Sequence, residues 1–324
     1  MPAAARDVET ACRAGDCETA IGLMEDAVAR QPHDFRLPYR LGICYGGSCR
    51  PHRLVDSAMA VAYLSHASGL TAHLQGADRA AVMDELANAL CRPSTSSPEA
   101  LRKAIACYRE AAEIYWSLGR PGDWARIEYN LGNCACDLSD LTGEDHWAEA
   151  VEHYQQSLSE RRRSRDPERV SALLENLGTA FRRLTAGDAG ENVRKAIGCY
   201  HGALRICPLG EASRRAALEN NLGNAFLSLP EADEKLRKRH AQRALRHFDR
   251  ALGMQPGGRS SRGYGITLFN RAQAFRRLDR RESAVACLEE AAAVFQTCGD
   301  ERRAQMAQSA ARALFLEPHQ AAPR

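Results

Sequence analysis

The chain has 324 residues, of which 44% are hydrophobic and 26% charged, and this composition excludes a wholly disordered protein. Basic residues exceed acidic ones by only three charges, which disfavours a nucleic-acid-binding protein, and no apolar run is long enough to span a membrane. Acidic residues at Asp7 and Glu9 precede any apolar stretch, so we expect no secretory signal and a cytoplasmic location. We expect most of the twelve scattered cysteines to be free thiols there. Only four of the 44 basic residues are lysine, which is typical of a GC-rich bacterial genome.

Two phrases alternate along the chain, and each has the spacing of an amphipathic helix. In chain order they begin at Ala20, Arg40, Ala60, Glu85, Ala104, Asn130, Ala150, Asn176, Ala196, Asn221, Ala244, Asn270 and Ala284. Glycine and proline cluster between the phrases, where helices are expected to end. We expect loops at 139–146 and 185–192, and a final amphipathic helix from Glu301 to Phe315.

The repeated unit is a pair of amphipathic helices, because copies of the phrase NLGNAFLSL start 45 to 49 residues apart. A single pair cannot bury its apolar face, so successive pairs must stack and share a continuous core. The sequence therefore predicts an all-α solenoid of stacked antiparallel helix hairpins, with about six to seven helix pairs. We expect one such domain over residues 1–315 and a mobile C-terminal tail over residues 316–324.

The phrases resemble the tetratricopeptide repeat. One helix of that repeat carries Leu-Gly followed by an aromatic residue, as at Leu177, Gly178 and Phe181, and its partner carries Ala, an aromatic residue and Ala, as in AIGCYHGA from Ala196. The resemblance covers roughly residues 7 to 315 and implies a right-handed superhelix. Units of 45 residues exceed the family's ~34, as in long-unit bacterial arrays fused to signalling ATPases or caspase-like proteases. We expect no such effector domain here, so any effector would act in trans.

Helical geometry places Asn220 and Asn224 opposite the packing residues Leu222, Gly223 and Phe226. In the tetratricopeptide family this free face lines a concave groove, where asparagines grip an extended partner segment. The resemblance implies partner-binding asparagines at two repeated positions, directly after the glycine and directly before the leucine. The candidates are Asn88, Asn133 and Asn224 at the first position, and Asn130, Asn176, Asn221 and Asn270 at the second. An asparagine before leucine would equally serve structure by joining helices of adjacent units.

Asn224 and Asn270 resemble the paired asparagines of the family's carboxylate-clamp subgroup. The lysine of that clamp is missing, because Asn220 stands at its position, so we do not expect a chaperone C-terminus as the ligand. Arginine pairs follow these positions by one turn, and a guanidinium binds a carboxylate in two places, which favours an acidic partner segment. The same arginines would also stabilise helix ends without any ligand. The pairs are Arg182 with Arg183 and Arg276 with Arg277.

A weak candidate for a metal site is the group Cys44, Cys49 and His52, because two thiolates and an imidazole could bind zinc. No fourth ligand is apparent, so we expect no metal and no cofactor. Cysteine and histidine also alternate at one position of the second phrase, which we interpret as core packing; the residues are Cys107, His153, Cys199, His247 and Cys287. We find no acidic or cysteine partner at ligand spacing for the histidines, including His146 and His240.

The leading hypothesis is a non-enzymatic interaction module that binds a peptide segment, with an acidic preference, in the groove of the solenoid. Motifs of nucleotide binding, zinc proteases and serine hydrolases are absent from the sequence. The main alternative is a regulatory sensor that binds a small molecule or signalling peptide inside the superhelix. A third class, catalysis or metal binding by cysteine and histidine, ranks lower. We expect neither nucleic acid nor a membrane as a partner, and the sequence does not predict an oligomeric state.

Overall fold

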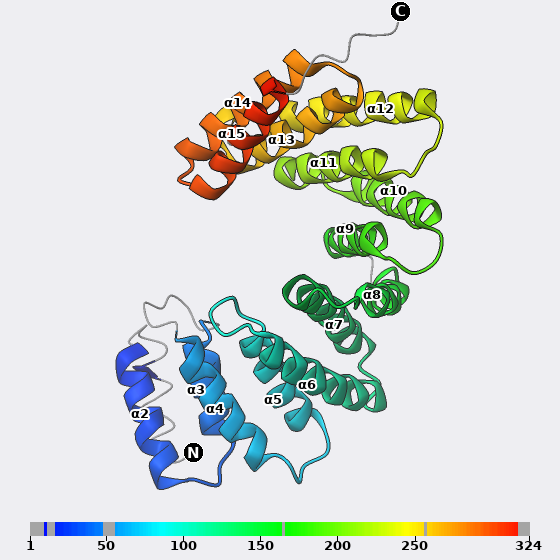
Figure 1. The fold of residues 1–324 in the computed structure, drawn as a ribbon. Coiled ribbons are helices and arrows are strands. Elements are labelled where there is room, and N and C mark those ends of the chain that lie inside the picture. Colours follow the sequence, from blue (N-terminus) through cyan, green and yellow to red (C-terminus); the bar gives the residue numbers. More distant parts are fainter. Residues whose placement is uncertain (1–9, 12–16, 48–55, 164–165, 256–257, 317–324) are drawn as a thin grey trace, which may run out of the picture. The chain divides into compact units, whose positions relative to one another are not determined.

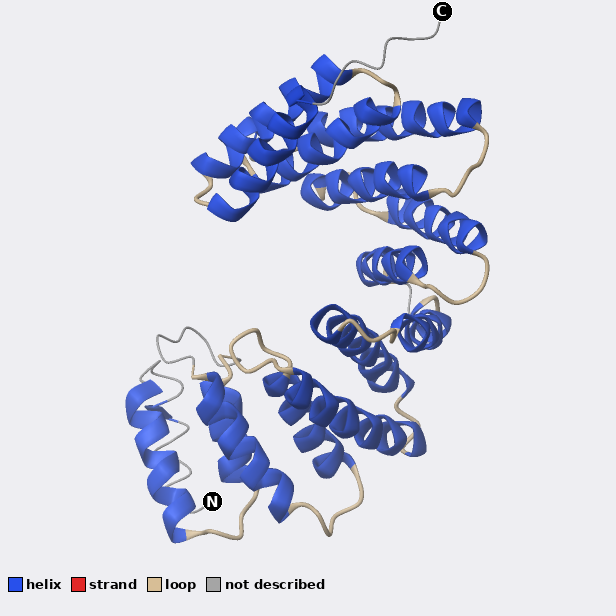
Figure 2. Ribbon diagram, viewed as in Figure 1, coloured by secondary structure: helices blue, strands red, loops and turns tan. Residues whose placement is uncertain are grey.

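A computed structural model describes residues 10–11, 17–47, 56–163, 166–255 and 258–316, and within these ranges every regular element is helical (Figures 1 and 2). The predicted all-α fold is therefore confirmed. None of the described helices is long and apolar enough to cross a membrane. The helices are α2 (Cys17–Arg30), α3 (Arg36–Tyr45), α4 (Ser57–Leu70), α5 (Ala77–Leu90), α6 (Pro98–Ser117), α7 (Pro121–Thr142), α8 (Trp147–Arg161), α9 (Pro167–Arg183), α10 (Ala189–Ile206), α11 (Ala212–Ser228), α12 (Glu234–Gly253), η1 (Gly258–Ser260), α13 (Arg262–Arg277), α14 (Arg281–Thr297) and α15 (Glu301–Leu316).

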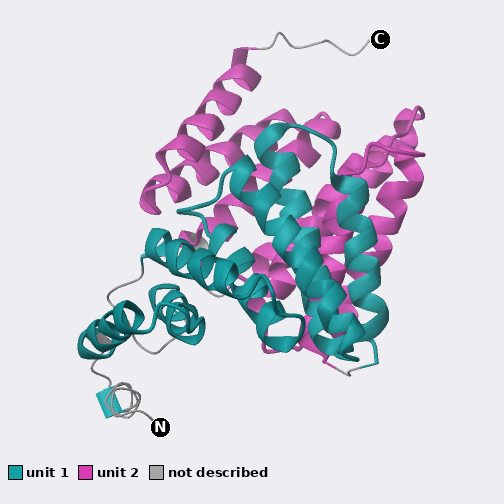
Figure 3. Cartoon of the chain, turned by 90° about the horizontal axis from the view of Figure 1, so that it is seen from below, with its two compact units in different colours: residues 1–164 teal, residues 165–324 magenta. Residues whose placement is uncertain are grey.

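The chain divides into two compact units, one holding α2 to α8 and the other α9 to α15 (Figure 3). Unit 1 comprises residues 1–164 and unit 2 residues 165–324. A single solenoid over residues 1–315 stays a prediction. The predicted tail lies, apart from Leu316 at the end of α15, outside the described residues.

Helix hairpins build both units. We call α3, α5, α7, α9, α11 and α13, which carry the Leu-Gly phrase or its variants, the first helices, and α4, α6, α8, α10, α12 and α14 the second helices. Each first helix packs against the second helix that follows it, and α15 packs on α14 after the last hairpin. In unit 2, α11 also contacts the first helices α9 and α13. The first helices of one unit therefore lie next to one another, and we call the surface that they form in each unit the first-helix face of that unit.

The recurring glycine exists because an aromatic ring of the second helix presses on the first helix. A Cβ atom added to Gly132 would lie 2.5 Å from the Tyr154 ring, and one added to Gly178 would lie 2.8 Å from the Tyr200 ring. Gly223 meets the ring of Phe248 in the same way. Such distances are shorter than carbon atoms tolerate, so the Leu-Gly pattern follows from close helix packing.

Two expected loops are shorter than the sequence predicted. Helix α7 continues to Thr142, whose hydroxyl donates to the carbonyl of Leu138 at 2.7 Å, and ends at Gly143 in the left-handed conformation with φ 76°. Helix α10 begins at Ala189 because the Asp188 carboxylate accepts from the Glu191 backbone N–H at 2.6 Å. The predicted final helix is confirmed, and it extends to Leu316.

Candidate functional site

The asparagines that follow the glycine position are anchored by tyrosines of the paired second helix. Asn88 accepts a hydrogen bond from the Tyr108 hydroxyl at 2.6 Å, and Asn133 accepts one from the Tyr154 hydroxyl at 2.7 Å. In α9 the position is a threonine, Thr179, whose hydroxyl lies 3.1 Å from that of Tyr200. These contacts give the repeated polar residue a structural role, because each satisfies a tyrosine hydroxyl at the edge of the core.

Asn224 is different because its second helix carries Phe248 in place of a tyrosine. Phe248 is fully buried and has no hydroxyl to donate. The half-buried Asn224 side chain has no hydrogen-bond partner among the described residues. Of the three candidates after the glycine, it is therefore the one whose amide is available.

The asparagines before the leucine bridge successive first helices. Asn130 donates to Asn88 at 3.4 Å, Asn221 to the Glu175 carboxylate at 3.2 Å, and Asn270 to Asn220 at 3.0 Å. Asn176 occupies the same position of α9 and is half-buried. Three of these asparagines thus form hydrogen bonds between helices of adjacent repeats, as the alternative interpretation predicts. Partner binding by these residues stays a prediction.

Carboxylates that are buried or half-buried lie on the same first helices as these asparagines. Asp84 of α5 is 4% exposed and accepts two hydrogen bonds from the Arg126 guanidinium of α7, at 3.0 and 2.5 Å. Burial raises the pKa of Glu175, and it also raises the pKa of Glu85, with repulsion by Asp84 as the second cause. On the first-helix face of unit 1, a bidentate ion pair thus joins α5 to α7.

The four predicted arginines lie at the ends of α9 and α13 in different environments. Arg182 is half-buried, and its Nε atom is buried without a hydrogen-bond partner. Arg183 is exposed. Arg276 donates to Gln273 at 3.1 Å, and the neighbouring Arg277 is exposed with no ion pair among the described residues. A role in binding an acidic segment stays a prediction for all four.

A cavity of about 360 Å³ opens between α13 and α15 and is bordered by Asn270. Its apolar wall includes Ile266 and Phe269 from α13 and Met306 from α15, whose side chain is 53% exposed. Arg302 stands at its rim, exposed and with no ion pair among the described residues. Asp300 and Arg303 also line it, and the Asp300 carboxylate is paired with Arg303 and with Arg262. The cavity therefore combines an apolar wall, a neutral amide, a carboxylate that is already paired and the available guanidinium of Arg302.

A second cavity, of about 380 Å³, lies over α7 between α6 and α8. Its aromatic wall is formed by Trp116 and Trp124, whose rings lie 4.9 Å apart, and Trp116 is 63% exposed. Glu128 and His153 also line it. None of the predicted asparagines or arginines borders this cavity.

The repeated histidines have acidic partners, contrary to the expectation from spacing alone. His153 Nδ1 lies 2.7 Å from Glu128, and His247 Nδ1 lies 2.6 Å from the buried Glu219. Glu128 and Glu219 occupy the same position of α7 and α11, so the signal in the sequence was a glutamate and a histidine that recur together in alternate hairpins. Cys107 and Cys287 are buried as expected, whereas Cys199 is half-buried.

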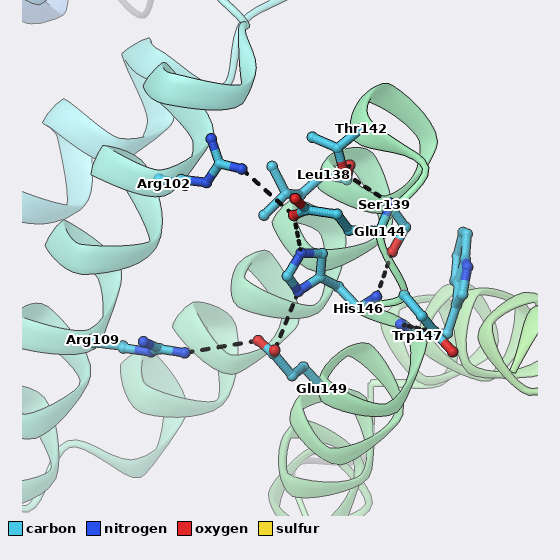
Figure 4. A network of polar contacts seen from close by, with 10 residues as sticks. Arg102, Arg109, Leu138, Ser139, Thr142, Glu144, His146, Trp147 and Glu149 are labelled. Carbon is cyan, nitrogen blue, oxygen red and sulfur yellow. Dashed lines mark hydrogen bonds and ion pairs between the residues drawn. The ribbon is translucent and has the colours of Figure 1, made fainter. Parts of the chain in front are cut away.

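His146 lies in a further network, before the first turn of α8 (Figure 4). Its ring nitrogens are each 3.2 Å from a carboxylate, Nε2 from Glu144 and Nδ1 from Glu149. Arg102 and Arg109 of α6 face these carboxylates at 3.5 and 3.8 Å. Burial lowers the pKa of His146, but the hydrogen bonds to the two glutamates outweigh it, so the pKa is raised overall. The network ties the α7–α8 loop to α6.

The weak metal candidate is only partly described. Cys44 is buried on α3, and Cys49 and His52 lie outside the described residues. Within the described ranges, no three histidine, cysteine or acidic side chains are grouped so that they could hold a metal ion.

Comparison with solved structures identifies proteins that share this fold. No protein-family model and no curated protein matches the chain. The apo form of the quorum sensor NprR from B. thuringiensis is similar in structure, with a TM-score of 0.64 and 13% identity over 98% of this chain and 82% of that one. The C-terminal part of a TPR repeat-containing protein from Cytophaga hutchinsonii has a TM-score of 0.55 and 13% identity, covering 93% and 98% of the two chains.

A chain of the APC/C hetero-tetramer Cut9–Hcn1 is also similar, with a TM-score of 0.54 and 16% identity over 96% of this chain. This chain spans 48% of that one, or about half its length. At identities of 13 to 16%, these structural similarities show a shared fold and nothing more. Together with the repeated helix hairpins and their Leu-Gly packing, these similarities show that the chain has the tetratricopeptide-repeat fold, an all-α solenoid.

Proposed function

We propose that the chain is a non-enzymatic interaction module that binds a peptide segment of a partner protein on the first-helix face of unit 2. The observation that carries this proposal is the cavity between α13 and α15, which borders Asn270. A cavity with an apolar wall and few polar groups at its edge is the usual form of a ligand site. In this proposal the partner is a separate effector protein in the cytoplasm.

The chemistry of the cavity favours a segment with an apolar side chain next to a carboxylate. Ile266, Phe269 and Met306 would contact the apolar side chain. Arg302 would bind the carboxylate through a charge-assisted hydrogen bond, because no described carboxylate occupies it. The Asn224 amide on the same face would hydrogen-bond to the peptide backbone.

A regulatory sensor is the second candidate. The cavity volume of about 360 Å³ lies at the small end of the range of small-molecule sites. The fold is also similar to that of NprR, which is named as a quorum sensor. In this case a small molecule would fill the cavity and shift α15 relative to α13.

The test is selection of a phage-displayed library of random twelve-residue peptides on the full chain, followed by affinity measurement on the enriched peptides. We expect enriched peptides to pair an acidic with an aliphatic residue, and Arg302→Glu to weaken binding at least tenfold, on the order of one charge-assisted hydrogen bond. Arg246→Glu is the matched control, because Arg246 is exposed on the second helix α12 and has no described ion pair.

Two outcomes would contradict peptide binding at this cavity. Enriched peptides that bind Arg302→Glu as tightly as the original chain would move the site elsewhere. A failure to enrich any peptide, combined with a rise in melting temperature from a panel of metabolites, would favour the sensor.

A further inference from the structure

Two cysteines from consecutive first helices of unit 1 lie in direct contact. Cys91 directly follows α5, and Cys134 lies within α7, yet their Sγ atoms are 3.2 Å apart. A disulfide has a sulfur–sulfur distance of about 2.05 Å, so the two atoms need to approach by only about 1 Å. Side-chain rotation and small backbone shifts supply such a displacement without a change of fold.

The surroundings make the two thiols unequal. The pKa of Cys91 is lowered, because the hydrogen bond from Cys134 outweighs burial and repulsion by Asp137. The pKa of Cys134 is raised, since that hydrogen bond and its own burial both favour the neutral thiol. Cys91 is half-buried, whereas Cys134 is 2% exposed. Cys91 therefore loses its proton more readily than Cys134 and is the more exposed of the two thiols.

Other described cysteines lack this combination. Burial raises the pKa of Cys107 to about 11 and also raises the pKa of Cys287. Cys136 is only two residues from Cys134 but belongs to a different environment, 3.5 Å from the Tyr154 hydroxyl. Cys136 is therefore a useful internal comparison.

We propose that Cys91 and Cys134 are an oxidation site at which hydrogen peroxide forms a disulfide between α5 and α7. The Cys91 thiolate attacks one peroxide oxygen, the O–O bond breaks, and Cys91 becomes a sulfenic acid while hydroxide leaves and takes up a proton. Cys134 then loses its proton and attacks the Cys91 sulfur, the S–O bond breaks, and the hydroxide leaves as water. In sum, two thiols and one peroxide give one disulfide and two water molecules.

The disulfide would staple the hairpin of α5 and α6 to that of α7 and α8, since it closes a loop across 43 residues. It adds to the contacts that already join α5 to α7, namely the Asp84–Arg126 ion pair and the Asn130–Asn88 hydrogen bond. The inference concerns unit 1 and does not depend on the proposed peptide site in unit 2.

The experiment treats the reduced full chain with one to five equivalents of hydrogen peroxide, blocks the remaining thiols with N-ethylmaleimide and maps the non-reduced tryptic peptides by mass spectrometry. We expect a cross-linked peptide pair that contains Cys91 and Cys134, lacks two hydrogens and is separated by dithiothreitol. The melting temperature should rise by about 5 °C on oxidation and fall back on reduction.

Cys91→Ser should abolish the cross-link, whereas Cys136→Ser should retain it and also remove the second cysteine from the Cys134 tryptic peptide. The disulfide mapping of the unsubstituted chain remains a valid test even if the Cys91→Ser variant folds poorly. The proposal is overturned if the first disulfide joins other cysteines, or if Cys91 proceeds to a sulfinic or sulfonic acid without cross-linking.

Discussion

The first-helix faces of the two units follow one template but join their helices differently. In unit 1, α5 and α7 are joined by an amide contact between Asn130 and Asn88 and, in addition, by the bidentate Asp84–Arg126 ion pair, with Asp84 almost completely buried. In unit 2, α11 and α13 are joined by the neutral amide contact between Asn270 and Asn220. Next to that contact lies the cavity between α13 and α15, with Arg302 at its rim.

This difference distinguishes polar groups that stabilise the fold from polar groups that are available to a ligand. In unit 1 the Arg126 guanidinium is paired with the buried Asp84 carboxylate, so these charged groups stabilise the fold. In unit 2 the contact between Asn270 and Asn220 joins neutral amides, and Arg302 of α15, at the edge of the neighbouring cavity, has no ion pair among the described residues. The available groups Asn224 and Arg302 both belong to unit 2, which is why we place the proposed site there.

The largest effect is expected from breaking the charged contact of unit 1. Arg126→Met leaves the Asp84 carboxylate buried and unpaired, and should reduce the free energy of unfolding by about 3 kcal/mol. Urea unfolding followed by circular dichroism measures this loss. The double variant Asp84→Leu with Arg126→Met should recover most of it, and a loss below about 1 kcal/mol in the single variant would show that this pair does not hold the contact.

A smaller loss is expected from Gly223→Ala in unit 2. The added Cβ would overlap the Phe248 ring, and overpacking of this kind costs about 2 kcal/mol. Gly198→Ala is the matched control, because no atom lies within 4 Å of its added Cβ in the middle of α10. It should stabilise the chain by about 0.5 to 1 kcal/mol through helix propensity. Equal effects in the two variants would refute the packing explanation of the Leu-Gly phrase.

The neutral contact of unit 2 should contribute less than the charged contact of unit 1. Asn270→Ala removes its hydrogen bond to Asn220 and should cost about 1 kcal/mol in urea unfolding. Asn224→Ala removes no hydrogen bond within the described chain and should leave stability unchanged within about 0.5 kcal/mol. A comparable loss from Asn224→Ala would mean that its amide serves the fold rather than a ligand.

The smallest effect is expected from pH, through His146 in unit 1. Because its pKa is raised in the folded chain, its stabilising contribution is fully present below the unfolded value near 6.5 and is lost as pH rises through the folded value. The melting temperature of the original chain relative to His146→Gln should thus decrease by about 1 °C between pH 5.5 and 8.5. A difference that grows with pH would contradict the sign.

Much of the candidate site could be predicted, but the partner of each side chain could not. The repeat register located the asparagines, and a comparison of Tyr108, Tyr154 and Tyr200 with Phe248 would have distinguished Asn224 in advance. The recurring glutamate and histidine were also visible in the register. Whether each of these groups has a hydrogen-bond partner depends on side chains 20 to 50 residues away in the sequence. Local helical periodicity gives no information on contacts at such separations.

By itself the sequence determined the helical hairpins, their order and the residues that face the core, because helical periodicity and the Leu-Gly phrase act within a few turns of chain. Tertiary packing alone decided the cavity between α13 and α15 and the contact of the Cys91 and Cys134 sulfurs. The cavity arises between the last hairpin and α15, and the sulfur contact arises between two neighbouring hairpins. In both places displacements of about 1 Å decide whether atoms are in contact, because interiors are close-packed and a disulfide has a fixed length.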